Sequence, residues 1–366
     1  MKDYKNDERI VMTLDAGGTN LVFGAIGQMQ EVVKPVRMPS CGDNLETCIK
    51  NIKHGFKEVI LQLPLAPHAI SFAFPGPADY PNGIIGDLKN LPAFKGGVPL
   101  KAILEEEFGI PVFINNDGDL YAYGEALCGF LPMINKQLQE AGSAKQFKNL
   151  IGFTLGTGFG GGIVCNGQLY IGDNSAGTEV WLLSNCEDNS VNIEEEISIR
   201  AVCCNYKFLS GETGEITPKD VYEIAKGVKT GNRNAALEAY KKLGRALGFA
   251  LTNMLTITDS LAVIGGGVSG AAGLFMPAMF EAMNENFTAK SGSVYPRLVQ
   301  KVFNLEDSSQ MALFAKGERK SIFTPLGKEI VYDTMSRVGV GISKIGTEKA
   351  ISLGAYAYAL GELDSK

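Results

Sequence analysis

The sequence is poor in the side chains that bind transition metals. Its 366 residues include only two histidines, His54 and His68, and its seven cysteines are scattered, with no Cys-x-x-Cys pair among them. Structural zinc sites usually need such pairs, so we expect no zinc. Scattered cysteines in odd number also fit reduced thiols better than a disulfide framework, which predicts a cytoplasmic protein.

Strong charge of one sign and long apolar stretches are also missing. The chain carries 34 Lys and Arg residues against 40 Asp and Glu residues, for a formal net charge of −6. Without a basic excess it is a poor partner for nucleic acid, whose phosphates must be neutralised. No apolar run reaches the roughly 20 residues of a membrane-spanning helix, and residues 1–7 do not resemble a signal peptide. We therefore expect neither a nucleic-acid partner nor a membrane.

The pattern that remains is that of an α/β protein with two lobes. A chain of 366 residues has ample material for two domains. Apolar strand patterns at residues 10–14, 69–74 and 112–114 alternate with helical patterns at 45–60 and 99–108. This alternation indicates a lobe with much parallel sheet.

Other segments are less regular. Asp43 is positioned to cap the helix at 45–60. Residues 131–149 are polar and predict a linker or surface excursion between the lobes, and residues 284–347 show no readable pattern. A helix of small residues at 350–360 could pack back onto the first lobe.

Three glycine turns each follow an apolar strand. The longest, residues 156–162, has five glycines in seven residues. Backbone N–H groups without side chains around them can approach a bulky anion closely, as phosphate sites require. Any one turn could be an ordinary hairpin, but the three together predict a cradle for a nucleotide triphosphate. Neither a P-loop nor a dinucleotide fingerprint matches them. The phosphate candidates are Gly17, Gly18, Thr19 and Asn20, then Gly156, Thr157 and Gly158, and finally Gly265, Gly266 and Gly267.

Carboxylates stand directly after two of the strands, where ligands of open α/β sheets bind. Asp117, beside Asn116, can accept a hydroxyl proton during phosphoryl transfer, a reaction that depends mainly on alignment and charge neutralisation. Alternatively Asp117 only caps the following helix, although Asp119 suits that position better. Asp15 can hold a hydrated Mg²⁺, or it can form a turn with its own backbone.

Together these motifs resemble the ROK family of sugar kinases and repressors, within the wider sugar kinase, Hsc70 and actin superfamily. The resemblance covers about residues 10–270 and is weaker at 350–360. It is specific because five motifs occur in the family's order. A family-like segment at residues 166–172 follows the longest glycine turn. The five motifs are Asp15-Ala16-Gly17-Gly18-Thr19-Asn20, Phe74-Pro75-Gly76-Pro77-Ala78-Asp79, Asn116-Asp117 with Gly124-Glu125, the glycines of 156–162, and Gly265-Gly266-Gly267-Val268.

The resemblance implies two ribonuclease-H-like lobes, as in actin-like ATPases, with a cleft that holds a sugar, ATP and Mg²⁺. The first lobe would comprise residues 1–130 with the helix at 348–363, and the second, nucleotide-binding lobe residues 131–347. Asp117 would be the base that activates a hexose hydroxyl, usually the 6-OH, and family members are often homodimers. The implied sugar contacts are Gly76, Asn90, Asn116, Asp117, Glu179 and Glu194, although Glu194 could instead belong to a solvated helix start.

The chain departs from the family pattern at its zinc loop. The family usually carries Glu-x-Gly-His, where this sequence has Glu179-Val180-Trp181-Leu182 and no histidine. Residues 185–192 also lack the family's cysteine pattern, so the loop cannot bind zinc in that way. Trp181 could reshape the sugar pocket, or it could be an ordinary core residue.

The sequence thus predicts a cytoplasmic ATP-dependent kinase of a hexose or N-acylhexosamine. Two other functions remain open, a non-catalytic sugar sensor and a ROK-type transcriptional regulator. Few residues precede the first strand, so we expect no DNA-binding domain in front of it. The residues leave open which sugar is used and whether ATP or polyphosphate is the donor.

Overall fold

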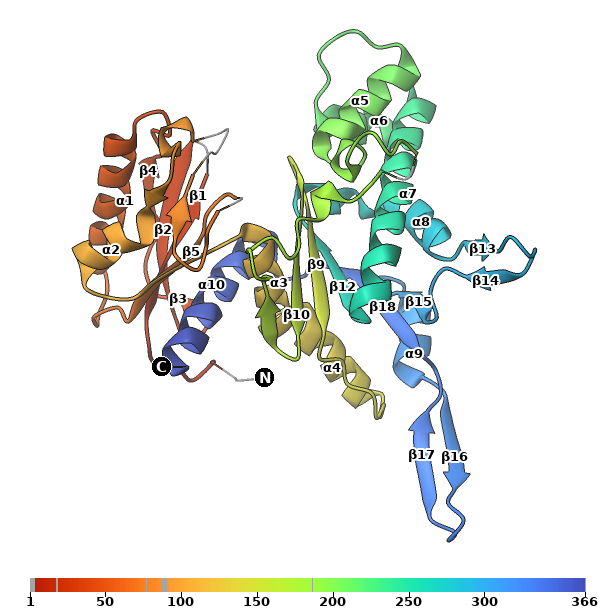
Figure 1. Ribbon diagram of the computed structural model, residues 1–366. Helices are drawn as coiled ribbons and strands as arrows, with labels where there is room; N and C mark the ends of the chain where they lie inside the picture. The colour runs from red at the N-terminus through yellow and green to blue at the C-terminus, as the bar shows by residue number, and fades with distance from the viewer. Residues whose placement is uncertain (1–3, 18, 77, 87–90, 186, 366) are drawn as a thin grey trace. The chain divides into compact units, whose positions relative to one another are not determined.

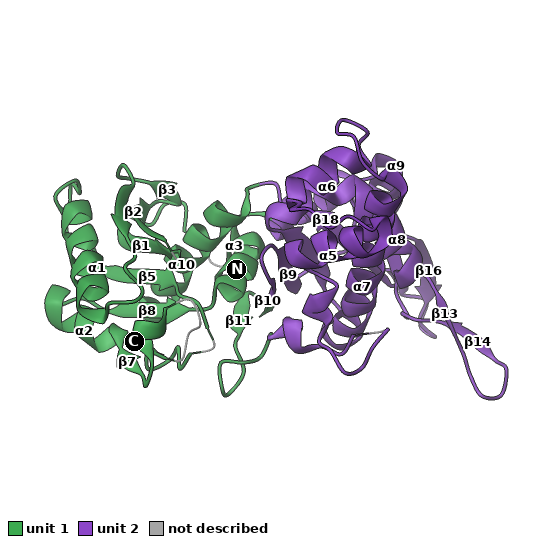
Figure 2. Ribbon diagram, turned by 90° about the horizontal axis from the view of Figure 1, so that it is seen from above, with its two compact units in different colours: residues 1–129, 162–178, 345–366 green, residues 130–161, 179–344 purple. Residues whose placement is uncertain are grey.

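The computed structural model describes residues 4–365 except residues 18, 77, 87–90 and 186 (Figure 1). The chain forms two compact units, shown in Figure 2. The first unit comprises residues 1–129, 162–178 and 345–366, and the second comprises residues 130–161 and 179–344. In the described part of the chain, none of the helices has the length and apolar character needed to cross a membrane.

The first unit is built on a mixed sheet whose strands run in the order β3-β2-β1-β5-β8, with β4 paired to β2. β1 is antiparallel to β2 and parallel to β5, which is in turn parallel to β8. The parallel part brings the carboxyl ends of β1, β5 and β8 to one edge. The strands are β1 (Val11–Ala16), β2 (Asn20–Gly27), β3 (Gln30–Glu31), β4 (Val36–Pro39), β5 (Ala69–Ala73) and β8 (Val112–Asn115).

Helices cover both faces of this sheet. α1 (Leu45–Ile60) is amphipathic, and its fully buried Phe56 packs against Phe23 and Phe72 of the strands. On the other face α10 (Thr347–Asp364) contacts β1 and β5 and packs against α3 (Asp117–Leu127). The expected C-terminal helix is thus present and lies in the first unit. The smaller elements of the first unit are β6 (Ile84–Ile85), η1 (Pro92–Phe94), β7 (Val98–Pro99), α2 (Leu100–Phe108) and β11 (Gln168–Tyr170).

A second sheet has the strand order β11-β10-β9-β12-β18-β15, and β10 passes from the second unit to the first between Gly161 and Gly162. β12 is parallel to both β9 and β18. The strands are β9 (Leu150–Leu155), β10 (Phe159–Cys165), β12 (Leu261–Gly265), β15 (Lys301–Asn304) and β18 (Arg337–Ile342). The helices of the second unit are α4 (Phe130–Glu140), η2 (Val180–Leu182), η3 (Ile193–Glu195), α5 (Ile199–Ser210), α6 (Pro218–Ala225), α7 (Arg233–Thr258), η4 (Gly267–Ala271), α8 (Ala272–Met283) and α9 (Ser308–Lys316).

Two short ribbons project from the second unit (Figure 1). One pairs β13 (Asn286–Thr288) with β14 (Val294–Pro296), and the other pairs β16 (Arg319–Phe323) with β17 (Glu329–Asp333). Asp333, at the base of the second ribbon, forms an ion pair with the fully buried guanidinium of Arg337 in β18. The segment that showed no sequence pattern therefore contains the ribbons, β15, α9 and β18.

Several sequence-based expectations differ from the structure. Residues 130–140 form helix α4 rather than a linker, because Phe130, Leu131, Ile134 and Leu138 bury one face. Asn44, not Asp43, caps α1, and its side chain accepts a hydrogen bond from the backbone N–H of Thr47. Residues 162–178 lie with the first unit, whereas the sequence-based division assigned 131–347 to one lobe. The reason is close packing, since a Cβ on Gly162 would lie 2.4 Å from the carbonyl oxygen of Gly118.

Candidate active site

The first unit gathers its candidate residues at one edge of the sheet. Asp15 of β1 is in register with Ala73 of β5, and Ala73 is in register with Asn115 of β8. Because these three strands are parallel, the residues that follow them leave the sheet at the same edge. Asn116 and Asp117 therefore lie at the strand-end edge that also carries Asp15, as the sequence pattern predicted.

Asp117 is the first residue of α3, and the residue before it caps the helix. The side chains of Asn116 and Asp117 both accept a hydrogen bond from the backbone N–H of Gly118, each at 2.8 Å. The expectation that Asp119 is the cap is wrong, because Asp119 is buried inside the helix and accepts a hydrogen bond from Thr178. Desolvation by the surrounding protein atoms raises the pKa of Asp117, although its side chain is accessible to solvent, and backbone N–H groups oppose the rise.

Asp15 stands at the mouth of the first glycine turn, where the N–H of Gly17 donates to the carbonyl oxygen of Asn20 at 3.0 Å. Within the described ranges no hydrogen bond engages the Asp15 carboxylate, and the alternative of a turn with its own backbone has no partner among these residues. Desolvation raises the pKa of Asp15, and so do the negative charges of Glu348 and Asp117. Asp15 and Asp117 thus share one electrostatic neighbourhood.

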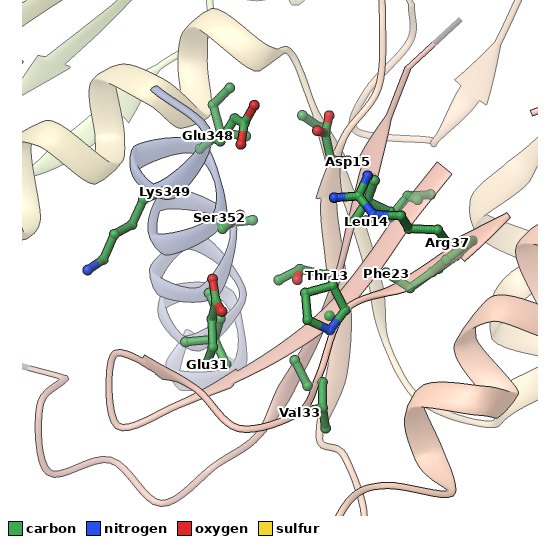
Figure 3. A pocket seen from close by; sticks show the side chains of 18 residues that line it. Thr13, Leu14, Asp15, Phe23, Glu31, Val33, Arg37, Glu348, Lys349 and Ser352 are labelled. Carbon is green, nitrogen blue, oxygen red and sulfur yellow. The ribbon is translucent and has the colours of Figure 1, made fainter. Parts of the chain in front are cut away.

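Arg37 offsets part of this negative charge, and no motif in the sequence predicted its position. It lies on β4 opposite Val22 of β2, and Val22 lies opposite Asp15 of β1, so the three residues form one row across the strands. Arg37 acts on the pKa of Asp15 in the opposite direction to Glu348, by lowering it. Both residues line a pocket of about 260 Å³, in which Figure 3 shows Asp15 and Arg37 on the strand side and Glu348 on the side of α10.

A tyrosine that the sequence analysis did not single out organises the loop after β5. The hydroxyl of Tyr80, which is buried, donates to the carbonyl oxygen of Phe74 at 3.0 Å and accepts from the side-chain amide of Asn116 at 3.5 Å. A Cβ on Gly76 would lie 2.3 Å from the Tyr80 hydroxyl, so glycine is required for this packing. Tyr80 therefore connects Gly76 to Asn116.

The second unit places two glycine turns side by side. β9 and β12 are parallel neighbours, and Gly265 lies in register with Thr154. Gly266 has a φ of 85°, and a Cβ at that position would lie 2.3 Å from the carbonyl oxygen of Leu155. The turn at 156–158 is closed by a hydrogen bond of 3.0 Å from the N–H of Gly156 to the carbonyl oxygen of Gly158. Two of the three predicted phosphate turns thus meet at the ends of adjacent strands.

The later glycines of the long turn have a different reason to be glycine. A Cβ on Gly160 would lie 2.5 Å from the hydroxyl of Thr154, and one on Gly161 would lie 3.0 Å from Val180. Gly162 is in close contact with Gly118, as described above. By contrast, a Cβ on Gly156 would meet nothing within 4 Å. Close packing therefore explains Gly160 to Gly162, and only the start of the turn is open to a ligand.

The two glutamates expected to contact sugar both have internal partners. Glu194 accepts a hydrogen bond of 2.9 Å from the backbone N–H of Phe159, so its carboxylate also braces the long glycine turn. Glu179 precedes η2 and accepts a hydrogen bond from the indole N–H of Trp181. Their role toward a sugar stays a prediction.

A further pocket, which the sequence analysis missed, lies beside the third glycine turn. Its volume is about 390 Å³, and it is formed by residues of η4 together with α5, α6 and α7. Lys219 and Tyr222 come from α6 and Tyr240 from α7. The pocket is formed by helices that are distant in the sequence and meet only in the folded chain. No local motif can therefore predict it. Its lining residues are Ile199, Val202, Pro218, Lys219, Tyr222, Tyr240, Gly267, Val268, Gly270 and Ala271.

The remaining predicted site residues divide into two groups. Thr19 and Asn20 are exposed at the first turn, whereas Gly18 and Asn90 lie outside the described residues. Over the residues that the structure describes, no group of three or more His, Cys, Asp or Glu side chains is arranged to hold a metal ion. The absence of zinc remains an expectation.

Comparison with known proteins identifies the class to which this fold and these residues belong. The model of the ROK family matches residues 11–309. The chain belongs to the ROK family.

Individual relatives are consistent with this assignment. The crystal structure of a glucokinase from Parabacteroides distasonis is 50% identical, covers 98% of this chain and 99% of its own, and superposes with a TM-score of 0.91. The N-acetyl-D-glucosamine kinase of Vibrio parahaemolyticus is 29% identical over 268 residues, which are 70% of this chain and 83% of the relative. A ROK family glucokinase from Streptomyces griseus, solved with glucose and AMPPNP, shares the fold, with 18% identity, a TM-score of 0.62, and 95% and 98% of the two chains covered. The predicted actin-like α/β fold is confirmed.

Proposed function

We propose that this chain catalyses the ATP-dependent phosphorylation of a hydroxyl group, the 6-OH, of a hexose or an N-acylhexosamine. The placement of Asp15 and Asp117 at one strand-end edge carries the proposal. The reaction needs one carboxylate to accept the proton of the hydroxyl group and another to hold the Mg²⁺ that accompanies the phosphates. The names of the 50% identical glucokinase and of the N-acetyl-D-glucosamine kinase support the same substrate class.

Asp117 acts as the base in the proposed reaction. Its carboxylate orients the sugar hydroxyl and takes the proton as the new oxygen–phosphorus bond forms and the bond between the γ-phosphorus and the β-phosphate oxygen breaks. A pKa above the ordinary carboxylate range suits this role, since the conjugate acid holds the proton more firmly. Asn116 and Gly76, which Tyr80 connects, position the sugar beside Asp117.

The glycine turns bind the phosphates of the donor. Backbone N–H groups of Thr157, Gly158 and Gly267 donate hydrogen bonds to phosphate oxygens, whereas those of Gly17 and Gly156 close their own turns. The carboxylate of Asp15 fits a hydrated Mg²⁺, because it is exposed, unbonded within the described chain, and surrounded by other negative charge. Magnesium would supply charge neutralisation on the phosphate oxygens.

The pocket beside η4 receives the adenine ring of ATP in this proposal. It adjoins Gly267, and Tyr222 and Tyr240 give it aromatic walls. Polyphosphate has no adenine ring to place in this pocket, so the pocket favours ATP as the donor.

A screen of sugars tests the proposal directly. Release of ADP is measured with Mg²⁺ and ATP across hexoses, hexosamines and N-acetylhexosamines, with product identified by mass. We expect turnover with at least one glucose-type sugar, and no turnover with any sugar would overturn the proposal. Calorimetry that finds sugar binding without nucleotide binding would instead favour a sugar sensor, and a gel shift with genomic fragments at stated salt would favour a regulator.

A further inference from the structure

Trp181 is the single tryptophan of the chain, and it lies two residues after Glu179. Its indole N–H donates to the Oε2 atom of Glu179. Both side chains are half-buried. A charged acceptor makes this one of the stronger kinds of hydrogen bond in proteins.

The backbone that carries these two residues is held in place independently of them. Val180 is buried against Gly161 of β10, and the N–H of Leu183 donates to the carbonyl oxygen of Val180 at 3.1 Å. The N–H of Ile193 in η3 donates to the carbonyl oxygen of Leu183 at 2.8 Å. The turn would therefore keep its shape without the indole bond, and only the Glu179 side chain would gain freedom.

The second oxygen of Glu179 is available to a ligand. Within the described residues no hydrogen bond or ion pair engages its Oε1 atom, and no lysine or arginine pairs with the carboxylate. The residue before it, Thr178, donates its hydroxyl to Asp119 of α3 at 3.1 Å, two residues beyond Asp117. The chain thus enters Glu179 from a residue that is tied to the helix of the proposed base.

We propose that Trp181 is a positioning residue for sugar binding: its indole N–H fixes one oxygen of Glu179 so that the other accepts hydroxyl groups of the sugar. This inference rests on the proposed function and deepens it. A free glutamate side chain loses conformational entropy when it is ordered by a ligand. The hydrogen bond from the indole N–H orders the Glu179 side chain before the sugar binds, so less entropy is lost on binding. Trp181 therefore contributes to sugar affinity rather than to the chemical step.

Two substitutions distinguish the contribution of the indole N–H from that of the aromatic ring. Trp181→Phe keeps an aromatic ring but removes the donor, whereas Trp181→His keeps a ring N–H. In Trp181→Phe we expect the KM for the sugar to rise about tenfold or more, the range of hydrogen bonds to charged groups, while the KM for ATP and kcat change less than about threefold. Trp181→His should recover part of the loss. A wild-type KM for the sugar in Trp181→Phe would overturn the inference.

A second measurement does not depend on turnover. Because the chain has a single tryptophan, intrinsic fluorescence at its excitation wavelength reports the surroundings of Trp181 alone. We expect Glu179→Gln to change the emission of the sugar-free protein, and N-acetylglucosamine or glucose to change the emission of the wild type but not of Glu179→Gln.

The two measurements also distinguish the failure of each idea. If the wild type phosphorylates no sugar, the proposed function fails, yet the emission of Glu179→Gln still reports the indole bond. An emission spectrum that is the same in the wild type and in Glu179→Gln would overturn the positioning role even in an active kinase.

Discussion

Asp15 and Asp117 are both carboxylates at strand ends, but their surroundings differ. Asp117 accepts the N–H of Gly118, whereas the Asp15 carboxylate makes no hydrogen bond to the residues that the structure describes. Arg37 lowers the pKa of Asp15 and does not contribute to that of Asp117. A carboxylate that a backbone N–H holds in one orientation suits a proton acceptor, and an unbonded one beside other charges suits a hydrated cation.

Replacing Asp117 by asparagine tests its role as the base. The amide has nearly the same shape and can still accept the N–H of Gly118, so we expect Asp117→Asn to fold and to bind sugar. Turnover should fall about 10²- to 10⁴-fold, the usual contribution of a general base. Initial rates give kcat, and calorimetry gives the sugar Kd. A rate near that of the wild type would refute the assignment.

The raised pKa of Asp117 also has a predicted sign in the pH profile. The base works only without its proton, so kcat/KM of the wild type should rise as pH increases through that pKa. Because desolvation raises it, the acidic limb should lie above the ordinary value for aspartate of about 3.9. The residual rate of Asp117→Asn should lack this limb. A limb at the ordinary value in the wild type would contradict the pKa shift.

Gly266 combines a positive φ with a close backbone contact, so one added methyl group should be costly there. Its φ of 85° is unfavourable for alanine, and the new Cβ would lie 2.3 Å from a backbone oxygen of Leu155, which cannot turn away. We expect Gly266→Ala to lower the free energy of unfolding by about 1–3 kcal/mol and to raise the KM for ATP, because the two adjacent turns would separate. Chemical denaturation and initial rates measure the two effects.

Gly273 provides the control, because a Cβ there meets nothing within 4 Å and the residue lies in helix α8. Gly273→Ala should be neutral or stabilising by up to about 1 kcal/mol. Equal losses in the two variants would show that the contact with Leu155 is unimportant.

Residues that stand next to a strand in the sequence could be predicted, and those that depend on distant pairing could not. Asp15 and Asp117 each follow an apolar run, so their position needs only local pattern. Arg37 reaches the same pocket through the pairing of β4 with β2 and of β2 with β1. Tyr222 lines its pocket because α6 meets α5, α7 and η4. No local motif predicts such contacts between distant segments.

Among the elements, α3 and α10 illustrate how a helix positions the base. Gly124 and Gly354 lie where the two helices touch, and a Cβ on Gly354 would lie 2.0 Å from the carbonyl oxygen of Leu120. The close approach is possible because both helices expose backbone to each other. α10 therefore fixes the helix whose first residue is Asp117.

The helix contact gives a prediction with a control on the same element. Gly354→Ala should destabilise the protein by about 1–3 kcal/mol, because the new methyl group meets backbone that is packed on all sides. Gly361→Ala, also in α10, should be neutral or slightly stabilising, since its Cβ would meet the hydroxyl of Tyr4 at an ordinary 3.7 Å. Thermal and denaturant unfolding measure both, and a Gly354→Ala variant as stable as Gly361→Ala would contradict the packing argument.

The sequence pattern was informative for regular elements and failed for two kinds of segment. The strands with continuous apolar runs, such as β5 and β8, were predicted nearly to their bounds. α4 was missed because polar residues and Pro132 hide its four buried positions. The β16–β17 ribbon was unreadable because nearly all its strand residues are exposed, so no alternation of apolar and polar residues is required.

At the scale of the whole molecule, the proposed chemistry is divided between the two units. Asp15, Gly17, Asn116 and Asp117 belong to the first unit, and the turns at 156–158 and 265–267 belong to the second. The pocket beside η4 also lies in the second unit. Changes to the pocket should therefore affect the donor without affecting the sugar.

Tyr222→Ala tests this division. Removing one aromatic wall of the pocket should raise the KM for ATP about tenfold, since a buried aromatic side chain contributes about 1.5–3 kcal/mol and 1.4 kcal/mol corresponds to a factor of ten. The KM for the sugar should stay within about twofold. Phe208→Ala is the matched control, because Phe208 lies on α5, is 83% exposed and does not line the pocket. Replacing ATP by polyphosphate sharpens the test, since a donor without adenine should be used equally well by Tyr222→Ala and the wild type. An unchanged KM for ATP in Tyr222→Ala would mean that the adenine ring binds elsewhere.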